Sequence, residues 1–200
     1  MSVMVDDQPL AVEKMGLQTI GQVLSHVQQG NRLVINLLID GKAPDLGGLG
    51  AIRRSPLDGH TVYIETAEPR AIALNVLLDV EQQLDQNDPL RTQAVDLLQQ
   101  NQPERALEKL HGWFHVWLTA QESVSKVSQL LRIDLDLLRA GGLPLSTVLQ
   151  QFAARLREIK SAIENRDFVT LGDILSYEMT ETEDDWREVL GAIRGVIDCR

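Results

Sequence analysis

The chain has 200 residues, a formal net charge of −10 and a hydrophobic share of 44%, so it can bury one ordinary core or two smaller ones. An acidic chain without a lysine or arginine block repels phosphate backbones and anionic lipids, which disfavours binding to nucleic acids and membranes. The lone Cys199 excludes an intramolecular disulfide and a thiolate metal cluster. Because no signal-peptide pattern and no apolar run of 18 residues are present, we expect a cytoplasmic protein.

The chain opens with a predicted hairpin and helix. The β-prone runs SVMV and PLAV flank the turn-forming residues Asp6-Asp7-Gln8. In residues 16–30, apolar side chains recur on one helical face before Gly30, which predicts a helix that ends there. That face comprises Ile20, Val23, Leu24 and Val27.

Two strands and a long loop follow. The segment NRLVINLLIDGK predicts an apolar strand that ends at the turn pair Asp40-Gly41. We expect GKAPDLGGLGAIRRSP to be a flexible loop, because its glycines lead neither into a helix N-terminus nor into a Gly-Lys-Ser/Thr phosphate cradle. The turn Asp58-Gly59 then predicts a last strand over residues 60–66.

This order, β-β-α-β-loop-β, resembles the ubiquitin-like β-grasp fold and small sulfur-carrier proteins in particular. Those proteins act through a free C-terminal Gly-Gly tail. Here the last strand continues into Ala67-Glu68-Pro69 and a helix, so the resemblance implies a fold without that activity.

From Pro69 onward the apolar spacing is helical, which predicts an antiparallel helical bundle. Asp88-Pro89 indicates an N-cap and first position that start a second helix. A third helix is predicted from Pro103 to Gly141-Gly142, a fourth is capped by Ser146, and a last one is capped by Asp167 or Thr170. We therefore predict an α+β chain with a β-grasp-like module, residues 1–67, and a helical bundle, residues 68–200. The whole is loosely similar to bacterial proteins of no assigned activity that join such parts and carry a segment like Asp167–Glu178.

The stretch HGWFHVW, residues 111–117, holds the strongest candidate for a metal site. Glu108, His111 and His115 are spaced so that one carboxylate and two imidazoles share a helix face. Di-metal bundles use Glu-x-x-His units in matched pairs, and this chain has one. We therefore favour a solvated helix face and predict no metal and no cofactor.

The same stretch offers either packing or a pocket. Trp113 and Trp117 fall on the apolar side of the helix and are expected to anchor the bundle or its junction with the module. Gly112 between them indicates close packing, a kink or a ligand slot. With Tyr63, these residues could line a pocket.

Charged residues supply candidate partner surfaces. Arg53-Arg54 could contact an anion or a protein, and an acidic run in the last helix could meet a basic partner. That run includes Glu181, Glu183, Asp184 and Asp185. The pattern fits no EF-hand loop, and a solvated face is the simpler interpretation.

We find no catalytic constellation: Cys199 has no neighbouring histidine, and no Gly-x-Ser-x-Gly elbow is present. The leading hypothesis is a non-enzymatic interaction or adaptor protein, in the class of acidic helical chaperones, that presents amphipathic helices to a protein partner or to a second copy. The alternative is a ligand-binding protein or enzyme with a pocket between the module and the bundle.

Overall fold

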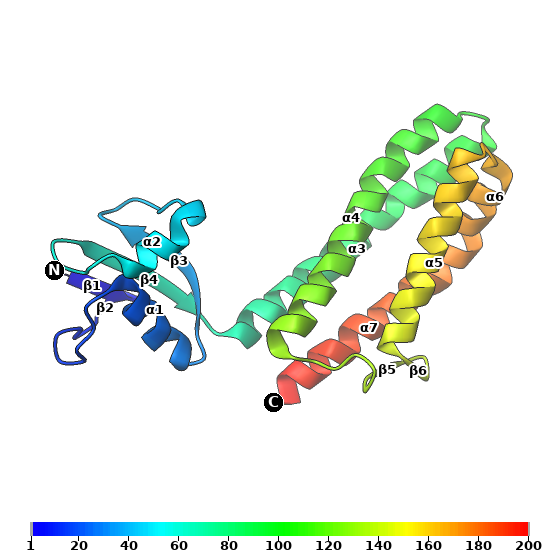
Figure 1. The fold of residues 1–200 in the computed structure, drawn as a ribbon. Coiled ribbons are helices and arrows are strands. Elements are labelled where there is room, and N and C mark those ends of the chain that lie inside the picture. The colour runs from blue at the N-terminus through cyan, green and yellow to red at the C-terminus, as the bar shows by residue number, and fades with distance from the viewer. Residues whose placement is uncertain (1, 200) are drawn as a thin grey trace. The chain divides into compact units, whose positions relative to one another are not determined.

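The computed structural model describes residues 2–199, apart from the side chains of Leu46 and Leu49. The protein is α+β, with a small sheet followed by a mostly helical region (Figure 1). Two compact units divide it, Met1–Ile72 and Ala73–Arg200. Strand β4 ends at Ala67, and helix α3 begins at Pro69. No helix among the described residues combines the length and apolar character that a bilayer span requires.

The first unit holds a mixed four-stranded sheet in the order β2-β1-β4-β3. The strands are β1 (Ser2–Val5), β2 (Gln8–Pro9), β3 (Leu33–Ile39) and β4 (Thr61–Ala67). The first and last strands, β1 and β4, pair in parallel, and the other neighbours are antiparallel. The strand ending at Asp40-Gly41 and the last strand are thus confirmed. The hairpin is confirmed with a shift, because its second strand is Gln8–Pro9 rather than the run PLAV.

Helix α1 (Ile20–Gln29) begins at a capping box formed by neighbouring residues. The Thr19 hydroxyl accepts from the Gln22 N–H, and the Gln22 side chain accepts from the Thr19 N–H, which forms a capping box. The predicted apolar face of α1 is buried in an aliphatic core with the sheet. That core contains Val3, Val12, Ile20, Val23, Leu24, Leu57, Val62 and Ile64.

The expected loop before β4 is wrong in part, because it contains the short helices η1 (Leu46–Gly48) and α2 (Leu49–Arg54). A glycine in α1 lets α2 approach: a Cβ on Gly21 would lie 2.5 Å from the Arg53 carbonyl oxygen. The other irregularity is in β3, whose pairing with β4 shifts between Val34 and Asn36. At the end of β3, Ile39 and Lys42 exchange backbone hydrogen bonds across the turn.

The second unit is built on long helices with short connections. Its elements are α3 (Pro69–Gln99), α4 (Pro103–Leu131), the hairpin β5 (Arg139–Ala140) and β6 (Leu143–Pro144), α5 (Leu145–Glu164), α6 (Phe168–Asp173), the π-helix η2 (Ile174–Glu178) and α7 (Met179–Cys199). Figure 1 shows α3, α4, α5 and α7 as the long members. Their apolar stripes enclose one core, at whose centre Trp113, Trp117, Trp186 and Phe152 form edge-to-face and tilted contacts.

Three predicted helix boundaries are wrong. Pro89 lies inside α3 rather than opening a helix, and the neighbouring Asn87 side chain donates a buried hydrogen bond to the Trp113 carbonyl on α4. Helix α4 ends at Leu131, and Arg132 follows it in a left-handed conformation, nine residues before Gly141. Ser146 lies inside α5 and contacts Asp136 instead of capping the helix. Asp167 does cap a helix, since it accepts from the Thr170 N–H of α6.

Candidate functional site

A groove of about 550 Å³ lies in the bundle between the end of α4, the connection 133–136 and the start of α5. We call it the α4–α5 groove. Its apolar lining comes from Ile133, Leu135 and Leu149. Ile133 and Leu135 lie in the segment that was predicted to continue the helix from Pro103 to Gly141-Gly142. Because α4 ends at Leu131, they form a groove wall instead.

One stripe of α4 forms the polar side of the groove. Gln121, Ser125, Gln129 and Arg132 follow one another at steps of three and four, so they share a helix face. Leu118 begins the same stripe one turn earlier and is 59% exposed. From Leu118 to Arg132 the stripe extends for about 21 Å, at 1.5 Å per residue.

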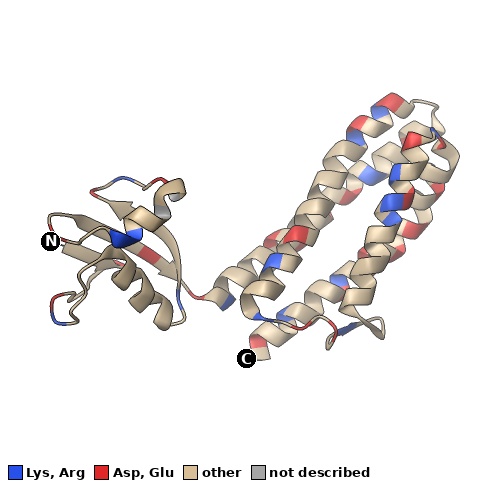
Figure 2. Cartoon of the chain, viewed as in Figure 1, with Lys and Arg blue, Asp and Glu red and all other residues tan. Residues whose placement is uncertain are grey.

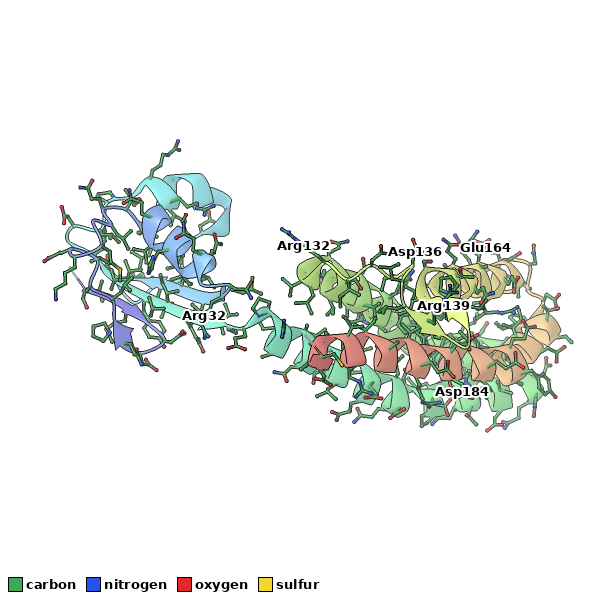
Figure 3. All side chains as sticks on the ribbon, turned by 90° about the horizontal axis from the view of Figure 1, so that it is seen from below. Arg32, Arg132, Asp136, Arg139, Glu164 and Asp184 are labelled. Atoms are coloured by element: carbon green, nitrogen blue, oxygen red, sulfur yellow. The ribbon has the colours of Figure 1, made fainter. Side chains whose placement is uncertain are left out.

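Arg132 is the uncompensated charge of the groove. Within residues 2–199 no carboxylate lies within ion-pair distance of its guanidinium. The nearby carboxylates have partners in their own connection: Asp134 accepts from the Asp136 N–H at 3.0 Å, and Asp136 contacts the Ser146 hydroxyl. Figure 3 shows Arg132 at the end of α4, with Asp136 and Arg139 along the connection to α5.

A second polar feature joins α3 to α7. Figure 2 shows that acidic and basic positions are interspersed along the bundle helices, and three groups of ion pairs link these two. Arg194 binds Glu81 through two hydrogen bonds of 2.8 and 3.1 Å, and Arg187 lies 3.4 Å from Asp85. The third group is Asp88, Arg91 and Glu183.

Among the described residues, Glu183 is the carboxyl whose pKa is shifted most. Its side chain is 12% exposed, and its Oε1 lies 3.3 Å from the Arg91 Nε. The pKa of the Glu183 carboxyl is raised to about 7, chiefly by burial; Arg91 and Arg187 oppose the shift, and Asp88 adds to it. Its carboxyl therefore changes charge near neutral pH.

The candidate metal ligands lie on the surface. Glu108, His111 and His115 are all exposed on α4, and the His115 carbonyl accepts from the Thr119 hydroxyl at 2.9 Å. Across the described residues, no three histidine, cysteine, aspartate or glutamate side chains come together as a metal site would need.

The tryptophans of α4 lie in the interior of the bundle, whereas Gly112 lies at its edge. Trp113 and Trp117 are 0% and 2% exposed, which makes both rings part of the core rather than walls of an open pocket. A Cβ on Gly112 would meet only Leu90 Cδ1, at an ordinary 3.5 Å, so packing does not require glycine there. Tyr63 lies in the other unit, on β4, where its hydroxyl donates to Asp7 at 3.2 Å.

The charged residues that were proposed as partner surfaces lie on different elements. Arg53 and Arg54 are exposed on α2, and Glu181 and Asp184 are exposed on α7. Burial, followed by repulsion from Glu188, raises the pKa of Asp185. Glu183 differs from the expected solvated face, because its position on α7 turns toward α3.

Sequence reasoning missed Arg132, Arg91 and the groove. Arg91 and Glu183 are 92 positions apart, and no local spacing relates them. Arg132 follows a helix end that no glycine marks. The one available signal was the change from apolar to Arg-Ile-Asp-Leu-Asp at residues 132–136, which is polar at every second position and interrupts the helical stripe.

The fold and the groove define an α+β protein whose helical bundle carries the candidate site. The family model Domain of unknown function (DUF8042) matches residues 75–189, which is more than half of the chain. The chain belongs to this family, and the matched part lies within the bundle and includes the whole groove. No curated protein and no solved structure matches the chain.

Proposed function

We propose that the protein is a non-enzymatic interaction protein whose bundle binds an amphipathic helix of a partner protein in the α4–α5 groove. The observation that carries this proposal is the α4 stripe, which combines an exposed leucine, three uncharged hydrogen-bonding side chains and an unpaired arginine beside an apolar wall. Helix-in-groove binding uses this combination, with apolar anchors for affinity and polar groups for orientation.

The chemistry of the groove specifies the partner segment. Ile133, Leu135 and Leu149 favour aliphatic side chains on one face of the bound helix. The free guanidinium of Arg132 favours a carboxylate at one end of that helix. Leu118, about 21 Å away along α4, favours another apolar residue near the other end. The expected ligand is thus a helix of three to four turns with aliphatic residues and a terminal acid.

We further propose that the first unit is related to β-grasp proteins and that the protein is cytoplasmic. Kinship of the first unit with β-grasp proteins is supported by its parallel β1–β4 pair and by the helix α1 packed on the sheet. A cytoplasmic location is supported by the lone cysteine, since reducing compartments favour chains without disulfides.

A random 16-residue peptide library displayed on phage and selected on the full chain tests the function. We expect enriched peptides with aliphatic residues at helical spacing and an acid near one end. Arg132→Glu should weaken their binding at least about tenfold, since a charge-assisted hydrogen bond contributes about 1.5–3 kcal/mol. Leu118→Ser, at an exposed position, should also weaken binding.

Arg105→Glu is the matched control. Arg105 is exposed on the same helix, 27 residues before Arg132, and its guanidinium donates to Gln102 rather than to a carboxylate. The control should leave the Kd unchanged. If no peptide is enriched, or if enriched peptides bind the Arg132→Glu and Leu118→Ser variants as tightly as the original chain, the proposed function is wrong.

A further inference from the structure

The cluster of Asp88, Arg91 and Glu183 joins three elements of the bundle and has no part in the groove. Arg91, on α3, is 11% exposed. Its Nε and Nη2 donate to Asp88 Oδ1 at 2.9 and 2.6 Å, and its Nη1 donates to the Leu175 carbonyl of η2 at 2.7 Å. Glu183, on α7, lies against the same guanidinium. A single arginine therefore ties α3 to the π-helix and to α7.

The contact with Leu175 is specific to the π-helix. The Met179 N–H donates to the Ile174 carbonyl, five residues back. In an α-helix its partner would be the carbonyl of Leu175, four residues back. The extra residue of a π-turn thus releases the carbonyl that Arg91 binds. Because Leu175 is fully buried, this charge-assisted bond stabilises the π-turn in place.

The charges around Glu183 come from two helices. Helix α3 contributes Asp88 and Arg91, and α7 itself contributes Arg187, which is shared with Asp85. A narrow slot beside Glu183 is also lined by Glu81, which Arg194 holds, and by Trp117, the uncharged contribution of α4. The two carboxylates of Asp88 and Glu183 therefore share one buried guanidinium.

We propose that Asp88, Arg91 and Glu183 form a proton-controlled latch that holds the π-helix and the start of α7 on α3 when Glu183 is protonated. With a neutral Glu183, the Arg91 charge is balanced by Asp88 alone, and Arg91 Nη1 keeps its hydrogen bond to the Leu175 carbonyl. Loss of the Glu183 proton places a second negative charge beside Arg91, on a side chain that is only 12% exposed. Solvation of that charge favours opening of the 174–186 segment.

The direction of the pH response follows from linkage. The pKa of Glu183 is about 7 in the closed segment, against its ordinary value of 4.5 once the segment opens and water reaches the carboxyl. The closed form therefore binds the proton more tightly. Opening becomes more favourable as pH rises from 4.5 toward 7, and it levels off above that range.

Hydrogen–deuterium exchange of the full chain between pH 6 and pH 8 tests the latch, with each rate corrected for the intrinsic pH dependence of amide exchange. We expect protection of amides 174–186 to fall about tenfold over this range. Peptides from the middle of α5, residues 152–163, should show no such change and serve as the internal reference.

Two variants separate the latch from a general effect of pH. Glu183→Gln should keep the segment at pH 8 at least as protected as the original chain is at pH 6, with no pH response. Glu181→Gln, at an exposed neighbouring position, should retain the tenfold response. A pH-independent 174–186 segment in the original chain, or an unchanged response in Glu183→Gln, would overturn the proposal.

Discussion

The two units of this chain differ in the charge that they carry and in how far they bury it. Residues 1–72 carry eight acidic and six basic side chains, and their core is aliphatic. Residues 73–200 carry 21 acidic and 13 basic side chains, and their core holds all three tryptophans. The bundle also takes charge inward, at Arg91 and Glu183. A longer helical interface can bury such groups because paired partners are available on neighbouring helices.

One carboxyl in each unit has a shifted pKa, and the two shifts have opposite directions. In the first unit, hydrogen bonds from the Thr66 hydroxyl and N–H, helped by Arg32, hold the pKa of Asp6 below its usual value. The stability from Asp6 is therefore present at neutral pH and is lost in acid. In the bundle, the raised pKa of Glu183 has the reverse consequence. The contribution of Asp6 is therefore lost in acid, whereas the contribution of Glu183 is lost as pH rises through about 7.

The largest expected effect is a selective loss of the bundle core. Trp186→Ala removes a fully buried ring whose centroid lies 5.5 Å from that of Trp117, and it should destabilise the bundle by about 3–5 kcal/mol. Urea denaturation followed by the fluorescence of the two remaining tryptophans measures this, since both lie in the bundle. Hydrogen exchange in β4 should stay unchanged; equal loss of protection there would contradict the separation of the units.

A smaller effect concerns the pH dependence of bundle stability. The free energy of unfolding should decrease by up to about 3 kcal/mol as pH rises from about 4.5 to 7, because each unit of pKa shift corresponds to about 1.4 kcal/mol. Glu183→Gln should remove this slope and leave the variant more stable than the original chain at pH 8. Urea midpoints at several pH values measure both, and equal slopes in the two proteins would refute the assignment.

In the first unit, Gly21→Ala should be destabilising. The new Cβ would lie 2.5 Å from a backbone oxygen of α2, so the two helices must separate, at a cost of about 1–3 kcal/mol. Hydrogen exchange of α1 measures the change. Tryptophan fluorescence melting of the bundle should be unaffected, and a variant with normal protection in α1 would show that the approach of α2 is not required.

The smallest expected effect comes from a second glycine-to-alanine substitution, which should stabilise the protein rather than destabilise it. Gly112→Ala places a Cβ at a comfortable 3.5 Å from Leu90 inside α4. It should stabilise the bundle by about 0.5–1 kcal/mol through higher helix propensity. Thermal melting followed by circular dichroism at 222 nm measures this. A lower melting temperature would indicate that Gly112 has a role beyond packing.

The elements governed by local chemistry could be predicted from the sequence. Helix α1 combined a capping residue at Thr19 with an apolar stripe that ends at Gly30, and the strands ended at turn pairs. Local sequence signals gave wrong helix boundaries where tertiary packing determines the backbone conformation. Asp88-Pro89 has the pattern of a helix start, yet α3 continues through Pro89, and the buried hydrogen bond from Asn87 to α4 helps to fix that part of the helix.

The candidate site was less predictable than the fold, because it too depends on tertiary packing rather than on local sequence signals. The stripe of α4 continued in the sequence through Leu135 and Leu138, although the backbone turns at Arg132. Those leucines keep their contact with the core from a non-helical connection. The burial of Glu183 depends on Arg91 from another helix, and the π-helix that accompanies it has no signature in apolar spacing.

The irregular β3 strand has a consequence for how the protein behaves at high concentration. Its sequence, LVINLLI, is uncharged and lies at the edge of the sheet, where a regular strand would offer backbone groups to other molecules. The bulge near Ile35 breaks the even spacing of those groups. The Ile39–Lys42 hydrogen bonds occupy the edge at its end. Together they shorten the template for strand addition and protect the chain against aggregation through this edge.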